Sequence, residues 1–253
     1  MSMAAPMLDS HCHLDRYEDP KATAAEAAER GVFIIAVTNL PSHFGAGLPH
    51  VRNFPRVRLA LGLHPLAVAD HVRERELFLK SLGLTSFVGE VGLDFSREGR
   101  DTRDTQLASF RFVAKCIASD RKVVSLHSRG AEAAVIDILT EFKLPISIFH
   151  WYSGPLGVLD EALSQGHFFS VNPAMVRSKK GQRIITRIPP DRALTETDGP
   201  YVKISRVPVR PWDIVLVESH LSHLWGIQPE EVRRRICSNF RHILCRLGVA
   251  MVA

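Results

Sequence analysis

The sequence predicts an α/β fold, and more specifically a (β/α)8 TIM barrel that forms a single domain over residues 1–253. Short apolar runs rich in Val, Ile and Phe alternate with longer amphipathic stretches, which is typical of parallel strands joined by helices. Eight such runs are present, as a closed barrel requires, and 253 residues is an ordinary length for one barrel. A composition of 45% hydrophobic and 23% charged residues is that of a globular protein.

Predicted strands and helices alternate along the whole chain. Gly31 and Gly166 stand where a glycine commonly ends a helix, and Pro229 begins the last predicted helix. The predicted strands are Ala5–Leu8, Val32–Val37, Val57–Leu63, Phe87–Val91, Val123–Leu126, Ile146–Phe149, Phe168–Val171 and Arg192–Leu194. The predicted helices are Pro20–Arg30, Glu74–Leu82, Arg103–Ser119, Ala131–Phe142, Pro155–Gln165, Ser178–Ile188, Pro211–Trp225 and Pro229–Leu247.

The composition excludes several classes of protein. No apolar run reaches the roughly 18 residues that a membrane-spanning helix needs, so we expect no membrane association. Residues 1–8 are too few for the core of a signal peptide and lack a basic leading segment, so we expect a cytoplasmic protein. None of the four cysteines forms a C-x-x-C pair, which argues against a zinc knuckle or a thioredoxin motif.

Histidines and acids follow the predicted strands at the points where the strands end. In a (β/α)8 barrel the C-terminal ends of all strands meet at one mouth, where catalytic residues gather. His11 and His13 are two residues apart, so both imidazoles face one side of an extended segment, whereas Cys12 points away. The other polar residues at strand ends are His64, Glu90, His127, His150, Glu196 and Asp198.

These side chains predict a metal centre. Imidazole and carboxylate are the expected ligands of hydrolytic divalent ions, and two ions roughly 3.5–4 Å apart can activate water and clamp the oxygens of a displacement. A lone histidine at a strand end is more often a hydrogen-bonded core residue, and for His64 both interpretations stay open. The joint placement at successive strand ends favours metal binding. The predicted ligands are His11, His13, Glu90, His127, His150 and Asp198.

The remaining histidines follow no predicted strand end, and we expect them to be surface or core residues. They are His43, His50, His71, His167, His220, His223 and His242.

Several segments that carry these residues resemble the motifs of one family, in the family's order and across almost the whole chain. The segments are Asp9–Asp15, Gly62–Pro65, Gly89–Asp94, His127–Arg129, His150–Gly154 and Glu196–Pro200, with Asn239 in the last predicted helix. Through them the chain resembles the TatD family of metal-dependent deoxyribonucleases, within the amidohydrolase-type barrels. One motif alone would be weak, but the ordered set is specific.

The resemblance implies a division of the site between two divalent ions, Mg, Mn or Zn. The implied ligands are His11, His13, Glu90 and Asp198 for the first ion, and Glu90, His127 and His150 for the second, with Glu90 bridging. His64 would stand near the ions and could meet a substrate phosphate, which Arg129 could grip through two hydrogen bonds. The expected catalytic residues are Asp198, Glu90, His64 and Arg129, and Asp198 is also expected to accept a proton from the attacking water.

The sequence departs from the family pattern in three places. Phe95 stands where many relatives have Tyr, and Tyr152 stands where Phe is usual. Residues 201–211 differ more, and because this loop would lie at the barrel mouth, the substrate preference could differ too. This shortened form also resembles the TatD-like member of the Qat antiphage systems, which would imply partner proteins of a defence system.

Three functions are compatible with the sequence. The first is a phosphodiesterase that cleaves DNA ends or single strands, the second a small-molecule amidohydrolase or lactonase, and the third a metal-stabilised subunit of a larger assembly. A net charge of +5 and basic residues after the predicted strands favour a polyanionic substrate, although each could equally belong to a solvated surface. These residues are Arg97, Arg100, Arg103, Arg129, Arg177, Lys179, Lys180, Lys203 and Arg206.

Overall fold

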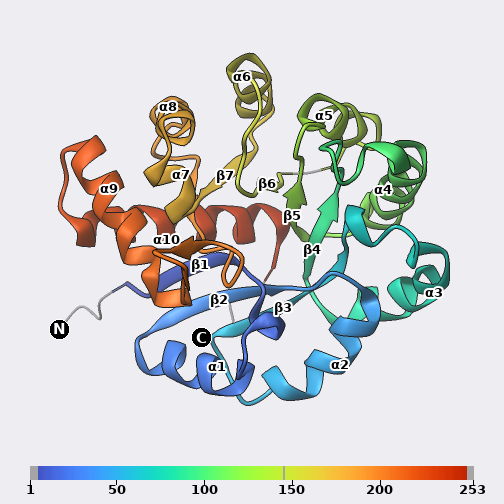
Figure 1. Cartoon of the computed structure of the whole chain (residues 1–253), viewed down its shortest axis with the longest axis horizontal. Coiled ribbons are helices and arrows are strands. Elements are labelled where there is room, and N and C mark those ends of the chain that lie inside the picture. Colours follow the sequence, from blue (N-terminus) through green and yellow to red (C-terminus); the bar gives the residue numbers. More distant parts are fainter. Residues whose placement is uncertain (1–4, 145, 250–253) are drawn as a thin grey trace.

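The computed structural model describes residues 5–144 and 146–249, which form a nearly closed barrel of strands surrounded by helices (Figure 1). Within these residues, eight strands pair side by side in sequence order, and every neighbouring pair is parallel. The strands are β1 (Met7–Cys12), β2 (Val32–Val37), β3 (Val57–Leu63), β4 (Phe87–Gly92), β5 (Val123–His127), β6 (Ile148–Phe149), β7 (Phe168–Val171) and β8 (Ala193–Thr195). The predicted (β/α)8 barrel is confirmed.

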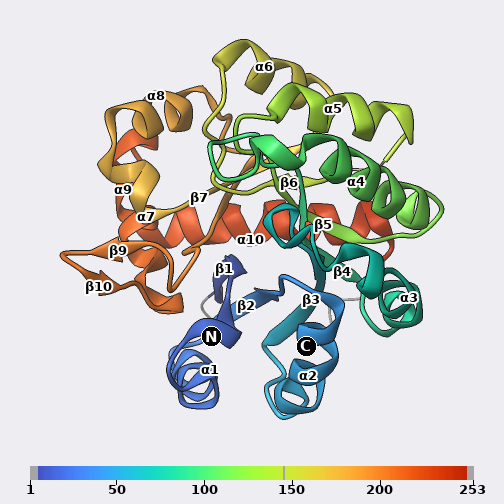
Figure 2. The same ribbon diagram turned by 45° about the vertical axis from the view of Figure 1, so that its right-hand side comes forward.

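Helices connect the strands on the outside of the barrel and cover it (Figures 1 and 2). The α-helices are α1 (Pro20–Glu29), α2 (Pro41–Val51), α3 (His71–Ser81), α4 (Arg103–Ile117), α5 (Glu132–Glu141), α6 (Leu156–Ser164), α7 (Pro173–Arg177), α8 (Lys179–Arg187), α9 (Val215–Trp225) and α10 (Pro229–Leu247). The 3₁₀ turns are η1 (Leu14–Arg16), η2 (Pro65–Ala67), η3 (Leu82–Leu84), η4 (Arg100–Thr102) and η5 (Pro211–Ile214). None of the helices in the described ranges is long and apolar enough to cross a membrane. The sequence argument against a signal peptide concerns residues 1–8, of which residues 1–4 lie outside those ranges.

Side chains join β1 to β8, where the barrel closes. The Ser10 hydroxyl donates a hydrogen bond to the Thr195 carbonyl at 2.9 Å, and the Thr195 hydroxyl donates to the Leu8 carbonyl. The buried Asp9 carboxylate accepts hydrogen bonds from both the N–H and the hydroxyl of Thr197. Because all these polar groups are buried and paired, the seam is stabilised by hydrogen bonds that a change to alanine would break. The seam also holds the loop after β8 against the end of β1.

Helix α10 closes the end of the barrel opposite the strand C-termini. The Asn239 side-chain amide donates to the carbonyls of Pro190 and Ala193, both at 2.8 Å, and these residues precede or begin β8. Cys237 contacts the carbonyl of Pro6, just before β1. In Figure 2, α10 runs as one long helix across the barrel. Within the described residues, α10 therefore leaves the other end of the barrel, where the strands have their C-termini, free for a site.

Strand β1 differs from the prediction, because it continues to Cys12 where an end at Leu8 was expected. The sequence did not predict a buried strand here, because Asp9, Ser10 and His11 are polar. Each nevertheless finds a buried partner: Thr197 for Asp9, Thr195 for Ser10 and Ser125 for His11. As a result His11 belongs to the strand itself, and His13 follows it.

Helix α2, the short helix α7 and a hairpin were not predicted. Helix α2 contains Gly45, Gly47 and Pro49, which disfavour helix, but burial of Phe44 outweighs that tendency. Residues 201–211 include a short antiparallel hairpin of β9 (Lys203–Ile204) and β10 (Val207–Pro208). Its two turn residues both have positive φ, 50° and 69°, as a tight two-residue hairpin turn requires.

Candidate metal centre at the barrel mouth

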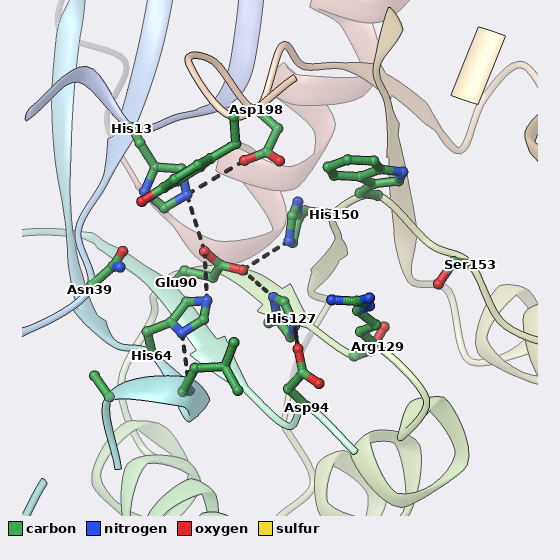
Figure 3. A pocket seen from close by; sticks show the side chains of 15 residues that line it. His13, Asn39, His64, Glu90, Asp94, His127, Arg129, His150, Ser153 and Asp198 are labelled. Carbon is green, nitrogen blue, oxygen red and sulfur yellow. Dashed lines mark hydrogen bonds and ion pairs between the residues drawn. The ribbon is translucent and has the colours of Figure 1, made fainter. Parts of the chain in front are cut away.

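The predicted site residues meet in one pocket at the C-terminal end of the barrel (Figure 3). The pocket has a volume of about 680 Å³, which is large enough for a nucleotide-sized group. It is lined by His13, Asn39, His64, Leu66, Ala67, Glu90, Asp94, His127, Ser128, Arg129, His150, Trp151, Ser153, Asp198 and Tyr201. Residues from seven different strand ends thus converge, and His11, at the end of β1, is fully buried.

Glu90, at 2% exposure in β4, is the centre of this cluster. Its Oε2 atom lies 3.2 Å from His13 Nε2, 3.4 Å from His64 Nε2 and 3.6 Å from His11 Nε2. Its Oε1 atom lies 2.9 Å from His150 Nε2 and contacts Nδ1 of His127. The two oxygens of one carboxylate therefore face two different groups of imidazoles.

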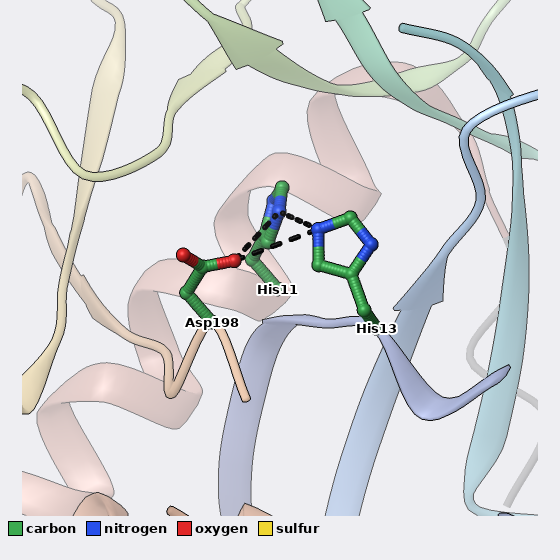
Figure 4. Close-up of side chains that lie close together, drawn as sticks. All are labelled: His11, His13 and Asp198. Atoms are coloured by element: carbon green, nitrogen blue, oxygen red, sulfur yellow. Dashed lines mark hydrogen bonds and ion pairs between the residues drawn. The ribbon is translucent and has the colours of Figure 1, made fainter. Parts of the chain in front are cut away.

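Asp198 completes the group on the Oε2 side (Figure 4). Its Oδ1 atom lies 3.5 Å from His13 Nε2 and 3.7 Å from His11 Nε2. The backbone of Asp198 has a φ of 49°, a left-handed conformation that few residues other than glycine adopt. A hydrogen bond from Asp198 N–H to the His11 carbonyl, at 2.9 Å, holds it there. The β1–β8 seam thus fixes this carboxylate beside the two histidines.

Asp94 holds His127 from the side opposite Glu90. Its Oδ2 atom lies 2.8 Å from His127 Nε2, while Nδ1 of the same ring faces Glu90. Asp94 is itself fixed, because its backbone N–H donates to Gln106 at 2.8 Å. Gly92 lets the end of β4 lie close to His127, because it has a φ of 138° and a Cβ atom there would lie 2.0 Å from the His127 carbonyl oxygen. Sequence reasoning missed Asp94, although an acid beyond Glu90 at the same strand end was a usable indication.

Glu196 plays the corresponding part behind His150. Its Oε1 atom lies 3.6 Å from His150 Nδ1 and accepts hydrogen bonds from Asn172 and from the backbone N–H of Trp151. Ser170 donates to its other oxygen. Glu196 is fully buried and does not line the pocket, so it places a negative charge behind His150 and leaves the mouth to Asp198. The sequence indicated Glu196 only as a strand-end acid, without this role.

His64 lies in the pocket with a defined ring orientation. Its Nδ1 accepts a hydrogen bond from the Leu66 N–H at 3.1 Å, so in the neutral ring the proton sits on Nε2, which faces Glu90. Behind it, the buried His71 contacts the His64 carbonyl through Nε2 at 2.9 Å and Ser109 through Nδ1 at 2.6 Å. His71 is a core residue, as expected, and it supports the segment that carries His64.

Comparison with known proteins shows the family of this chain. The family model described as TatD related DNase matches residues 8–245. The chain belongs to the TatD family. Among its relatives, deoxyribonuclease TATDN3 of Homo sapiens is 27% identical over 250 residues, which cover 89% of this chain and 90% of that protein. The 3′-5′ ssDNA/RNA exonuclease TatD of Pectobacterium carotovorum is 31% identical over 150 residues, 56% of this chain and 57% of that protein.

A solved structure supports the same assignment. The crystal structure of YJJV, a TatD homologue from Escherichia coli K12, matches with a TM-score of 0.85 and 26% identity, covering 94% of this chain and 97% of that one. The fold and the family agree, so this TatD family member is a metal-dependent hydrolase.

The pKa values of the histidines and of Glu90 in the TatD site are shifted by burial and by their mutual charges. Burial lowers the pKa of His11 to about 4 and also lowers that of His64. Burial acts in the same direction on His127 and His150, but the negative charge of Glu90 outweighs it and raises the pKa of both rings. Burial alone would raise the pKa of Glu90, yet the surrounding imidazoles hold it well below its usual range. The Glu90 carboxylate and these two imidazoles therefore favour each other's charged forms.

The donor set fits divalent ions. Candidate ligand atoms lie within 4.8 Å of one another in three groups: His11, His13 and Asp198; His11, His150 and Glu196; and His64, Glu90 and His127. Nδ1 of His13 and Nδ1 of His150 are buried with no hydrogen-bond partner, so the polar network of the protein alone is incomplete. Imidazoles that crowd one carboxylate, together with a second acid, are the chemistry of a metal centre.

Arg129 is the one arginine or lysine that lines the pocket within the described residues. Its side chain is 57% exposed, and its nearest acid, Glu98, is 3.6 Å away and also exposed. The guanidinium is thus free to turn toward a substrate. The other basic residues predicted near the mouth do not line the pocket; Arg103, for example, lies over the ring of Phe95.

Proposed function

We propose that this TatD family member is a deoxyribonuclease that hydrolyses phosphodiester bonds in DNA ends or single strands, with two divalent ions, Mg, Mn or Zn. The names of its relatives support this proposal: one is a deoxyribonuclease, and another is an exonuclease of single-stranded DNA and RNA. The observation that carries the proposal is the position of Glu90, whose two oxygens face two separate sets of histidines.

These two sets supply the ligands of the two ions. His11, His13 and Asp198 would hold one ion together with Glu90 Oε2, and His127 and His150 would hold the other together with Oε1. Asp94 fixes the ring orientation of His127, which is the usual task of a carboxylate behind a metal-bound histidine, and Glu196 places a second carboxylate 3.6 Å from Nδ1 of His150.

Divalent ions bound here would lower the pKa of a water molecule and neutralise charge on the phosphate. The residues of the chain supply the remaining functions. Asp198 accepts the proton of the attacking water at its carboxylate, which lies in the pocket. His64 donates a hydrogen bond from Nε2 to a phosphate oxygen. Arg129 binds the phosphate through its guanidinium and stabilises the charge that develops during the displacement.

The experiment is incubation of the purified full-length chain with end-labelled single-stranded DNA and Mg²⁺, Mn²⁺ or Zn²⁺, with EDTA and a Glu90→Gln variant as controls. We expect cleavage that requires the ion and Glu90. Hydrolysis of an uncharged ester or amide without any DNA cleavage would instead make the protein a small-molecule amidohydrolase or lactonase. Inactivity on every substrate, with ions bound, would favour a metal-stabilised subunit.

A role in antiphage defence with partner proteins, and a cytoplasmic location, remain predictions from the sequence. The hairpin of β9 and β10 is the chain's own version of the segment on which the Qat resemblance rests. Affinity purification of the tagged chain from its native cells would test both, because a stable defence complex would co-purify in the cytosolic fraction.

A further inference from the structure

Two large aromatic side chains line the pocket without being buried. Trp151 is 37% exposed and Tyr201 is 52% exposed, although rings of this size usually lose most of their surface on folding. Each follows a residue of the metal centre closely, because Trp151 is next to His150 and Tyr201 is three positions after Asp198. Exposed aromatic rings at the mouth of a polar pocket are available to a ligand.

Tyr201 is fixed on the side of the site that holds His13. Its ring packs edge-on against the His13 ring, with centroids 4.8 Å apart and an interplanar angle of 76°. Its backbone N–H donates to the Asp198 carbonyl at 3.0 Å. One edge of the ring is therefore held by the metal centre while the rest faces the pocket.

Trp151 is fixed on the side of the site that holds His150. Its backbone N–H donates to Glu196 Oε1 at 3.0 Å, and its φ of 37° is rare for a bulky residue. A strained backbone persists only where its surroundings impose it, so the site determines the main-chain conformation from which the indole projects. Among the described residues, no aromatic ring or cation covers the indole, whereas Trp212 lies under Arg30 and Trp225 under Arg235.

The two rings line the pocket from different loops, Trp151 after β6 and Tyr201 after β8. Tyr201 packs against His13, which contacts Oε2 of Glu90, and Trp151 follows His150, which contacts Oε1. A phosphate held above Glu90 would lie in the pocket that both rings line. Its two ester oxygens lead to the two nucleosides that the phosphate joins.

We infer that Trp151 and Tyr201 stack on the nucleobases on either side of the scissile phosphate, and that the site therefore selects strands whose bases are free to unstack. This inference rests on the proposed deoxyribonuclease function. A base inside a duplex already stacks on its neighbours, whereas a base in a single strand or a frayed end can lie on a protein ring. The substrate class is single-stranded or end-frayed DNA, and the preference does not depend on base identity, because every base has a π-face.

The first test compares substrates that do or do not carry the bases. A single-stranded oligonucleotide is made intact, and again with abasic tetrahydrofuran residues at both termini. For Trp151→Ala we expect KM on the intact strand to rise roughly tenfold, with a smaller change in kcat and little effect on the abasic strand. Trp151→Phe should restore KM, since a phenyl ring still stacks. Tyr201→Ala should behave like Trp151→Ala, and Trp225→Phe, at a distant tryptophan, should change neither substrate's KM.

A second test does not need catalysis, so it separates failure of the inference from failure of the proposed function. In EDTA, the intact single strand should quench the fluorescence contributed by Trp151, measured as the difference from Trp151→Phe, and the abasic strand or a blunt duplex should quench it much less. Equal KM losses for Trp151→Ala on intact and abasic strands would show that the ring only supports the site. Equal quenching by all three ligands, or by none, would overturn stacking even if the enzyme cleaves DNA.

Discussion

The carboxylate of Asp94 lies 2.8 Å from Nε2 of His127, so that this ring is held between Asp94 on one side and Glu90 on the other. The contact determines which nitrogen of His127 faces the metal centre, because a carboxylate keeps the proton on the nitrogen next to it. The pKa of Asp94 is lowered to about 2 although burial opposes this, chiefly because His127 and Ser96 donate hydrogen bonds to the carboxylate. Asp94 is therefore ionised throughout the working range of pH.

We expect Asp94→Ala to weaken metal binding and activity by about 10- to 100-fold, the usual effect of removing a carboxylate behind a metal-binding histidine. The matched control is Asp101→Ala, which removes an exposed acid from the loop that follows Asp94. Metal titration by calorimetry measures the loss of metal affinity, and rates at saturating metal measure the loss of activity that remains once the metal is bound. Unchanged metal affinity in Asp94→Ala would show that the contact does not orient the ring for an ion.

Glu90 should matter more to metal content than any single histidine. Because its two oxygens face both halves of the centre, Glu90→Gln should reduce bound metal at both positions, whereas His127→Ala should reduce it mainly on the Oε1 side. Metal content per chain, measured by elemental analysis after gel filtration, should fall from about two to near zero and to about one, respectively. Both variants should lose hydrolysis, and circular dichroism should show that the fold persists. Full activity in Glu90→Gln would refute the mechanism.

Asp198 should set the acidic limb of the pH–rate profile. Burial raises the pKa of this carboxyl to about 7 in the structure without ions, and a divalent ion beside it would lower that value. Only the ionised form accepts a proton, so kcat/KM should rise with pH and level off above the Asp198 pKa, below 7 in the loaded enzyme. Asp198→Asn should remove this limb and most of the rate. A variant that retains its metal and nearly the full rate would exclude Asp198 as the base.

The placement of the centre could be predicted because the barrel has a simple rule: side chains at the ends of parallel strands converge, whatever lies between them. His64, His127 and Asp198 are far apart in the sequence, yet each follows an apolar run, and the structure brings them into one pocket. The alternation of apolar runs with amphipathic stretches was enough to predict the fold. The metal experiments above test their assignment as ligands.

What the sequence could not predict depends on tertiary contacts. Strand β1 runs through Asp9 because Thr197, far along the chain, satisfies its carboxylate. Helix α2 forms despite its internal Pro49, since the burial of Phe44 outweighs local preference. The supporting part of Glu196 depends on which side of His150 it occupies, and neither spacing nor composition determines that.

His167, away from the mouth, should make the fold sensitive to acid. It is 2% exposed, its Nδ1 accepts a hydrogen bond from the Ser147 N–H at 3.1 Å, and burial lowers its pKa to about 4. The unfolded chain binds the proton near pH 6.5 and the folded one does not. The free energy of unfolding is therefore unaffected by this group above pH 6.5. It should fall by up to about 3 kcal/mol as the pH decreases from 6.5 to 4.

The measurement is urea unfolding in EDTA between pH 8 and pH 4. His167→Asn keeps an acceptor for the Ser147 N–H, so it should lower stability at pH 8 through the lost ring but flatten the dependence on pH. Since other buried groups also titrate, the informative quantity is the difference in slope between variant and wild type. His50→Asn, at an exposed position, is the control and should keep the wild-type slope. An identical slope in His167→Asn would contradict the assignment.

Arg129 and the lysines of α8 should affect DNA cleavage in different ways. Arg129 lines the pocket, so Arg129→Ala should lower kcat by about 100-fold through loss of charge stabilisation, and Arg129→Lys should recover only part of it because the two-pronged contact is lost.

Lys179 and Lys180 are exposed outside the mouth, so their joint replacement by Ala should mainly raise KM. If both bind phosphates, the slope of log binding constant against log salt should become shallower by about 1.4 for single strands. Lys115→Ala, on the distant end of α4, should leave the slope unchanged. A salt-independent KM in the wild type would remove the case for a polyanionic substrate altogether.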